Sequence, residues 1–427
     1  MDKVSISIIM PVYNPGIYFE ECLQSIFAQT FTDFELICVN DASKDKLALQ
    51  LLETYPNRYP NMRVLQMEQN VGAGESRNRG LQEAVGEYVI FLDADDVYAK
   101  EMLERMHGKC VEEDADVCIC GYTWFDAQDI GKKTTYEWKP NILELEDWDN
   151  EKFFIYWAAC PWNKLCKRDF LVDNNIFFQS LSSYNDVFFS FMVGKKAAKK
   201  AYITDLDLIK HRDNIPTQIS ATRDHRNLIY SVDFMINELK RQKKYDEIVK
   251  TQLMWYLIIC SMGALKTCRD ENKNREFYSM VRDCLERIPV TKDHSNLYTL
   301  YYNYTKLPYE SRWFENKIDF FSKIRSYSED LQKLFQRKNP LFLWGLGKRG
   351  EAFQKFCKEV NLNIDGVADI KNENIGSCTE FGNKIFSTYE IVKSNGCIVA
   401  SNESIYNELI KMRLQADVIN LEEYCPD

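Results

Sequence analysis

Residues 89–96 read Val-Ile-Phe-Leu-Asp-Ala-Asp-Asp, and this stretch decides the predicted fold. Its apolar residues run without polar alternation, which predicts a strand buried on both faces, as in a parallel sheet. Asp93, Asp95 and Asp96 follow directly, at the strand end where open α/β sheets bind ligands. Carboxylates suit Mg²⁺ and Mn²⁺, which proteins commonly hold together with substrate phosphates. The stretch therefore indicates a divalent cation that joins the protein to a diphosphate; the alternative is a solvated acidic turn without a ligand.

The bulk composition is that of a globular protein. At 427 residues the chain is long enough for two or three domains. Its formal net charge of -10 argues against a general nucleic-acid binder, which needs a basic face. Its 14 cysteines form no Cys-x-x-Cys pair, and we expect them to be reduced and buried, as in a cytoplasmic protein. Residues 1–3 lead into a strand without a signal-peptide pattern, and no apolar run approaches the ~18 residues of a membrane span.

Two further strand ends place polar side chains at the same sheet edge. Residues 4–10 and 34–39 read as strands joined by a helical segment at 18–29. The second strand leads to Asp41, which can accept a hydrogen bond from a base N–H or, alternatively, cap a helix. A later glycine-rich loop opens a helix that carries Arg77, and such helix starts hold anionic groups. The strand ends predict one ligand crevice in a doubly wound half-domain.

Four short motifs follow one another along this half-domain: Pro-Val-Tyr-Asn at 11–14, Val-Asn-Asp-Ala-Ser at 39–43, Asn-Val-Gly at 70–72 with Ser-Arg-Asn at 76–78, and Phe-Leu-Asp-Ala-Asp-Asp at 91–96. In this order they closely resemble the inverting family-two glycosyltransferases, which have the GT-A fold. The resemblance implies a nucleotide-diphosphate-sugar donor with a divalent cation, Mn²⁺ or Mg²⁺, on its diphosphate. It assigns the metal to Asp95 and the donor contacts to Pro11, Tyr13, Asn14, Asp41, Arg77, Asp93 and Arg212.

One loop departs from the family pattern. Residues 40–43 read Asn-Asp-Ala-Ser where the family often has Asp-Asp-Gly-Ser. Asn40 removes one charge, and Ala42 takes a positive φ less readily than glycine does. We therefore expect this loop to differ from the family's, around a donor that we expect to be a UDP-sugar.

An aromatic run follows a polar stretch. Residues 123–150 are polar and read as an irregular surface excursion, and residues 153–162 then hold five aromatic side chains. Such a run can line an acceptor site or, alternatively, form a helix buried against the sheet. Residues 162–171 resemble the acceptor-side segment of the family, which makes Trp162 the first candidate for stacking on a sugar.

Asp186 is the predicted catalytic base. The apolar spacing after it predicts a helix that starts at or near this residue. The family has its base here, usually as Glu-Asp, and an inverting transfer needs such a carboxylate to take the acceptor's proton. This chain has Asn185 before the aspartate, which makes Asn185 an acceptor-side candidate and removes a like charge that would raise the pKa of Asp186. The alternative is a plain helix N-cap.

Two basic segments have more than one interpretation. Four lysines within residues 195–200 fit either anionic lipid headgroups or a solvated helix end. His211 and Arg212 resemble the closing segment of the family, in which Arg212 reaches the diphosphate. His211 is then a further metal ligand or a surface residue.

The C-terminal half reads as two parts. Residues 224–337 are almost free of glycine and show helical periodicity, including a helix at 314–337. Residues 345–350 read Gly-Leu-Gly-Lys-Arg-Gly after a predicted strand, and Asp369 ends the next strand about twenty residues on, as in dinucleotide sites. This Rossmann-like module either binds a nucleotide or serves packing and partner contacts. The predicted domains are 1–222, 223–337 and 338–427.

The predicted architecture is α/β: a GT-A domain, a helical region and a small Rossmann-like domain. We expect an inverting transfer of sugar to a glycan or lipid-linked hydroxyl in surface polysaccharide biosynthesis. We expect a cytoplasmic location with peripheral contact at the inner face of the plasma membrane, oligomer contacts through the C-terminal regions, and no nucleic-acid partner. The alternatives are an NAD(P)-dependent oxidoreductase that uses residues 345–350, and a non-catalytic sugar-nucleotide-binding scaffold.

Overall fold

The computed structural model describes most of the N-terminal half and parts of the rest. The described residues are 4–127, 129–140, 142–147, 152–204, 208–213, 223–268, 270–288, 295–309, 341–345, 348–359, 362–368, 379, 383–386, 397–400 and 417–420. The chain divides into two compact units, Met1–Leu257 and Ile258–Asp427. The boundary between the units lies inside a helix. Two units are a coarser division than the three predicted domains, and the domain boundaries stay a prediction.

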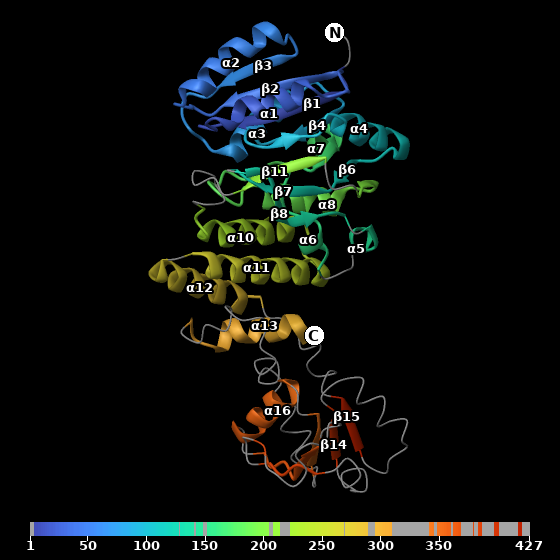
Figure 1. Ribbon diagram of the computed structural model, residues 1–427, viewed down its shortest axis with the longest axis vertical. Coiled ribbons are helices and arrows are strands. Elements are labelled where there is room, and N and C mark those ends of the chain that lie inside the picture. The colour runs from blue at the N-terminus through green and yellow to red at the C-terminus, as the bar shows by residue number, and fades with distance from the viewer. Residues whose placement is uncertain are drawn as a thin grey trace. The chain divides into compact units, whose positions relative to one another are not determined.

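A seven-stranded sheet forms the core of the first unit (Figure 1), in the order β10-β6-β9-β4-β1-β2-β3. Its strands are β1 (Ile6–Val12), β2 (Phe34–Asn40), β3 (Met62–Gln66), β4 (Tyr88–Phe91), β6 (Val117–Cys120), β9 (Lys164–Lys167) and β10 (Lys200–Ile203). Neighbours run parallel, except that β9 is antiparallel to both β4 and β6. Every residue of β2 and β4 is buried, which confirms the expectation of strands covered on both faces.

The helices between these strands follow the predicted apolar spacing. The apolar stripe of α1 (Tyr18–Phe27) is buried. The N-cap of α2 (Lys46–Arg58) is Asp45, whose carboxylate accepts from the Leu47 amide at 3.0 Å. The glycine-rich loop leads into α3 (Ala73–Glu83). Further helices of this unit are α4 (Met102–Glu113), α5 (Ile142–Glu146), α6 (Phe153–Tyr156), α7 (Arg168–Asp173), α8 (Val187–Lys196) and α10 (Arg226–Arg241).

A smaller sheet, in the order β5-β11-β7-β8, carries the chain beyond the acidic turn. Its strands are β5 (Val97–Tyr98), β7 (Tyr122–Asp126), β8 (Asp129–Trp138) and β11 (Ile209–Asp213). The prediction that residues 123–150 are irregular is therefore wrong for β7 and β8. Shifts of register in the β7–β8 ladder interrupt the period-two pattern, and β11, the other partner of β7, is distant in sequence.

The predicted helical region contains α11 (Glu247–Thr267), α12 (Glu271–Glu286) and α13 (Ser295–Lys306). By length and composition α11 can cross a membrane, because residues 247–266 have a mean hydropathy of 1.4. The expectation that no apolar run approaches this length is corrected here, since scattered polar residues such as Gln252 and Ser261 conceal the run. However, 72% of the apolar window is buried within the protein, as is common for a core helix. The helix predicted at 314–337 lies outside the described residues.

The second unit contains a parallel four-stranded sheet in the order β13-β12-β14-β15. The strands are β12 (Leu341–Trp344), β13 (Gly366–Ala368), β14 (Cys397–Ala400) and β15 (Asp417–Asn420), with α16 (Lys348–Glu359) after β12. Gly345 has a φ of 106°. A Cβ at Gly350 would lie 1.9 Å from the carbonyl oxygen of Gly345. Close packing thus accounts for both glycines. Asp369 lies outside the described residues, and nucleotide binding by this module stays a prediction.

Candidate active site

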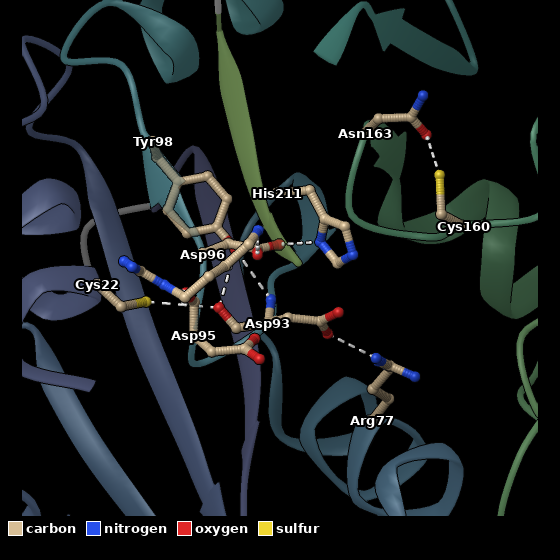
Figure 2. A network of polar contacts seen from close by, with 10 residues as sticks. Cys22, Arg77, Asp93, Asp95, Asp96, Tyr98, Cys160, Asn163 and His211 are labelled. Atoms are coloured by element: carbon tan, nitrogen blue, oxygen red, sulfur yellow. Dashed lines mark hydrogen bonds and ion pairs between the residues drawn. The ribbon is translucent and has the colours of Figure 1, made fainter. Parts of the chain in front are cut away.

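Tyr98 of β5 fixes the acidic turn that follows β4. The Asp93 amide donates to the Tyr98 hydroxyl at 3.0 Å, and this hydroxyl donates to the Asp93 carbonyl oxygen at 2.9 Å. The Sγ of Cys22 on α1 donates to the same oxygen at 3.4 Å (Figure 2). Burial raises the pKa of Tyr98 well above its usual value, which keeps the hydroxyl protonated. Side chains of β5 and α1 therefore both contact the main chain of this turn.

The carboxylates of the turn have different partners, as Figure 2 shows for Asp93 and Asp96. Asp93 accepts from Nη2 of Arg77 at 2.7 Å, a charge-assisted bond. Asp96 is fully buried and contacts His211. Asp95 has a partly exposed side chain, which is the placement that a metal ligand shared with a substrate requires. Asp95 stays the predicted metal ligand.

His211 of β11 is oriented by Asp96. Its Nδ1 lies 2.9 Å from Oδ2 of Asp96, and its ring stacks on Trp162 at 5.0 Å. Burial lowers the pKa of His211, but the charges of Asp96, Asp93 and Asp95 outweigh burial and raise it to about 9. In metal sites a carboxylate commonly binds one ring nitrogen and so directs the other at the ion. The contact with Asp96 and the stacking on Trp162 do not fit a surface residue, and metal ligation by His211 stays a prediction.

Arg212 lies inside the protein, and its contact with the donor diphosphate stays a prediction. Its side chain is 1% exposed, and its guanidinium lies 4.4 Å from the ring centres of both Tyr18 and Phe125. Nη2 lies 2.5 Å from Oε2 of Glu21, and Nε donates to the Asp95 carbonyl oxygen at 2.7 Å. Because aromatic rings and protein acceptors surround the guanidinium, Arg212 holds the acidic turn against α1.

Arg77 of α3 joins the acidic turn to the loop before α8. Besides pairing with Asp93, it donates from Nη1 to Oδ1 of Asn185 at 3.0 Å. Both Arg77 and Asn185 are buried, and a Cβ at Gly74 would lie 2.9 Å from the Cβ of Asn185. Arg77 thus binds protein acceptors at both ends, and the predicted roles of Arg77 in donor binding and of Asn185 on the acceptor side stay predictions.

Asp186 occupies the N-cap position of α8, but its carboxylate makes no capping hydrogen bond. The capping alternative is therefore not supported. Burial raises the pKa of Asp186 above 3.8, and the charge of Arg77 opposes this rise. A raised pKa suits a general base, because it brings proton affinity closer to the working pH. Burial causes this rise in the pKa of Asp186, so the rise does not need a second acid at position 185.

Asp41 anchors the loop between β3 and α3. The residue is 1% exposed, and its carboxylate accepts from the amides of Val71 at 2.7 Å and Gly72 at 2.8 Å. It does not cap α2, whose N-cap is Asp45. A carboxylate has further lone pairs, so a contact between Asp41 and a base stays a prediction.

The ends of β1 and β2 meet at Asn14. Its Oδ1 accepts from two amides of the loop after β2, at 2.8 and 3.0 Å. Ala42 has a φ of 56°, so it adopts the left-handed conformation despite its Cβ, and the difference of this loop from the family's stays a prediction. Tyr13 is 51% exposed and Pro11 is partly exposed. Donor contacts by Pro11, Tyr13 and Asn14 stay predictions.

The aromatic run at residues 153–162 is largely buried, as its alternative interpretation held. The two phenylalanines of α6 have no exposed surface. Trp162 is 6% exposed and packs between Tyr122 and His211, with ring centres 4.4 and 5.0 Å away. Protein side chains already cover most of the indole, so its stacking on a sugar stays a prediction.

Lys164 of β9 is a site residue that the sequence reading did not single out. It is fully buried, and its Nζ donates to the carbonyl oxygens of Ala158 at 2.7 Å and Cys160 at 2.8 Å and to Oδ1 of Asn163 at 2.9 Å. Burial lowers its pKa. The ammonium thus organises the loop that ends in Trp162. The available signal was a lysine at the start of an apolar strand, where a charge needs buried acceptors.

The described residues contain no group of three or more His, Cys, Asp or Glu side chains placed to hold a metal ion. A cation at Asp95 would therefore use one or two protein carboxylates and complete its shell with phosphate and water oxygens, which is common for Mg²⁺. The partly exposed carboxylates of Asp93 and Asp95 fit this donor set.

Comparisons with known proteins find one family model and several relatives. Residues 7–171 match the family model described as glycosyl transferase family 2. The uncharacterized glycosyltransferase YibD of Escherichia coli (strain K12) is 32% identical over 48% of this chain and 60% of that protein. The poly(ribitol-phosphate) beta-N-acetylglucosaminyltransferase TarS of Staphylococcus aureus (strain MW2) is 32% identical over 47% of this chain and 34% of that protein. The minor teichoic acid biosynthesis protein GgaB of Bacillus subtilis (strain 168) is 26% identical over 86% of this chain and 43% of that protein.

The chain thus spans 60% or less of the length of these relatives. Among solved structures, S. aureus TarS 1–349 in complex with UDP-GlcNAc superposes with a TM-score of 0.56 at 23% identity. The superposition covers 78% of this chain and 94% of that chain. At this identity the likeness concerns the fold alone.

Proposed function

We propose that this chain transfers a sugar from a nucleotide diphosphate to an acceptor hydroxyl with inversion. Its residues 7–171 match the model of glycosyl transferase family 2, and the chain has the GT-A fold. The observation that carries the proposal is the bridge made by Arg77. One guanidinium joins Asp93 of the acidic turn to Asn185, the neighbour of Asp186. The bridge joins the segments that carry Asp186, the proposed base, and Asp95, the proposed metal ligand, and so supports one shared site.

The proposed reaction is a direct displacement. The acceptor oxygen bonds to the anomeric carbon while the bond from this carbon to the diphosphate oxygen breaks, and its electron pair leaves with the diphosphate. Asp186 takes the hydroxyl proton, for which its raised pKa is suited. A divalent cation at Asp95 would supply positive charge for the leaving diphosphate. Tyr98 and Arg212 keep the turn that bears Asp95 in place.

We propose a UDP-sugar as the donor. Tyr13 and Asp41 lie at the C-terminal ends of β1 and β2, where open α/β sheets bind ligands. UDP-GlcNAc is the first donor to test, because the TarS structure contains it. For the acceptor we propose a glycan or a polyol-phosphate chain in surface polysaccharide synthesis at the cytoplasmic face of the membrane. TarS is a poly(ribitol-phosphate) beta-N-acetylglucosaminyltransferase and GgaB a minor teichoic acid biosynthesis protein, and both support this proposal. These relatives do not favour the oxidoreductase or the scaffold alternative.

A ligand screen tests this proposal. We expect UDP-GlcNAc or another nucleotide sugar to raise the Tm in the presence of Mn²⁺ and to raise it less after chelation. Asp95→Ala should abolish both the Mn²⁺-dependent shift and the release of UDP. Asp173→Ala, which changes an exposed acid at the end of α7, should leave both intact. If no nucleotide sugar raises the Tm with or without Mn²⁺, the proposal is wrong.

A further inference from the structure

The start of α10 fixes the loop at residues 182–185. Ser183 donates from Oγ to the carbonyl oxygen of Asp224 at 3.0 Å. The hydroxyl of Tyr184 lies 2.9 Å from Nδ1 of His225. The chain segment just before α10 is therefore hydrogen-bonded to the loop that ends at the proposed base.

Tyr184 has a backbone conformation that its side chain disfavours. Its φ is 57°, in the left-handed region that bulky residues rarely adopt. Contacts of its side chain hold it there. Cζ of Arg223 lies 5.4 Å from the centre of the Tyr184 ring, and the Tyr184 hydroxyl is hydrogen-bonded to His225. Such outliers cluster at functional sites. Tyr184 thus forms a fixed platform for Arg223, two residues before Asp186.

Arg223 presents an exposed positive charge next to the proposed base. Its side chain is exposed, and its charge lowers the pKa of Asp186. Arg77 also acts on Asp186, but it is buried and bound to Asp93. Lys164, a further cation that interacts with Asp186, is buried against loop carbonyl oxygens. Of these three cations, Arg223 is the exposed one.

The negative charges around this site disfavour an anionic substrate, and a nearby cation offsets them. The acidic turn at residues 93–96 and a chain with a formal net charge of -10 repel anions. Asp224, the next residue, accepts from Nε of Arg226 at 3.0 Å and from its Nη2 at 2.7 Å. This acid is thus bound by a second arginine. A guanidinium offers the same two-donor geometry to a phosphate.

We propose that Arg223 binds a phosphate group of the acceptor, next to the hydroxyl that Asp186 deprotonates. The inference rests on the proposed transfer reaction and adds the substrate class: an acceptor built from phosphate esters of a polyol or sugar, and not a neutral glycan. Arg223 contacts the phosphate and no reacting atom. It therefore governs the affinity for the acceptor and not the chemical step.

The test compares three small acceptors at constant ionic strength: ribitol, ribitol 5-phosphate and ribonate. UDP release from UDP-GlcNAc with Mn²⁺ gives kcat and KM for each, and calorimetry on the UDP-bound protein gives their affinities. We expect the wild type to prefer ribitol 5-phosphate in both measurements. Arg223→Gln should raise the KM and Kd for ribitol 5-phosphate about ten-fold, with kcat and the values for ribitol unchanged. The control Arg226→Gln removes a nearby exposed arginine and should keep the preference.

An equal affinity of the wild type for ribitol and ribitol 5-phosphate would overturn the inference, as would an unchanged phosphate preference in Arg223→Gln. A preference for ribonate over ribitol 5-phosphate would also overturn it, because the anion would then be a carboxylate. Calorimetry decides the matter even without turnover, so the two proposals fail separately. If Asp186→Asn retains turnover, the proposed function fails; if Arg223→Gln retains the preference, this inference alone fails.

Discussion

The acidic turn after β4 and the loop before α8 hold the two halves of the proposed chemistry, and they are fixed in different ways. Side chains from neighbouring elements hold the turn: Tyr98 its main chain, Arg77 and His211 two of its carboxylates. The loop is held through Ser183 and a strained tyrosine, while the carboxylate of Asp186 makes no capping bond. A metal site needs fixed carboxylates, whereas a base needs one that can meet the substrate's proton.

The largest effect on stability is expected on the turn side, from Arg212→Met. The change removes a buried guanidinium that joins α1 to the acidic turn and leaves the Asp95 carbonyl oxygen without that donor. We expect the free energy of unfolding to fall by about 3 kcal/mol, as when one partner of a buried polar pair is removed. Urea denaturation checks this value.

Glu21→Gln serves as the control for Arg212, because Glu21 is 41% exposed and should lose less than about 1 kcal/mol. The outcome that contradicts this account is an Arg212→Met protein of normal stability that has lost its affinity for UDP. Arg212 would then be the donor contact that the family resemblance implied.

A smaller effect of opposite sign is expected from Ala42→Gly. Ala42 holds a φ of 56°, which costs an L-residue more than glycine. Part of this gain is lost to the greater flexibility of glycine in the unfolded chain, so we expect the free energy of unfolding to rise by about 0.5 kcal/mol. Ala84→Gly, at a φ of -68°, should instead lower it. A destabilised Ala42→Gly protein would show that the methyl group contacts matter more than the backbone strain.

The smallest expected effect concerns pH and the loop side. Burial lowers the pKa of His225 below 6.5, with Arg223 adding to the effect. As the pH falls, His225 therefore takes up a proton in the unfolded chain before it does so in the folded protein. The stability linked to His225 is complete above about pH 6.5 and is lost below it. His225→Gln should lose less stability between pH 7.5 and 5 than the wild type in urea denaturation. An unchanged difference between the two pH values would exclude this role.

The sequence predicts the main sheet well, because its strands are short apolar runs that end in polar residues. The same runs place Asp93, Asp95 and Asp41 at one sheet edge, as observed. The strands β7 and β8 escape prediction, since their ladder is irregular and polar and one partner is distant in sequence. Local sequence patterns predict the backbone conformation of their own segment, and not its pairing with a strand far away in the sequence.

Side-chain roles are harder to predict than side-chain positions. Arg212 matches the family's motif, yet only the fold shows that Tyr18 and Phe125 enclose its guanidinium. Asp41 and Asp45 are both plausible N-caps in sequence, and the structure assigns the cap to Asp45. When several distant elements bury a side chain, the residues next to it in the sequence do not reveal that it is buried.

The kcat for UDP release by Asp186→Asn, measured with UDP-GlcNAc, Mn²⁺ and ribitol 5-phosphate, tests the central claim most directly. Asparagine keeps the shape of the side chain and cannot take the proton, so we expect kcat to fall about 1,000-fold, with the Kd for UDP unchanged. The unchanged Kd separates a lost base from a disturbed donor site. A kcat within about three-fold of the wild type would contradict the claim that Asp186 is the base.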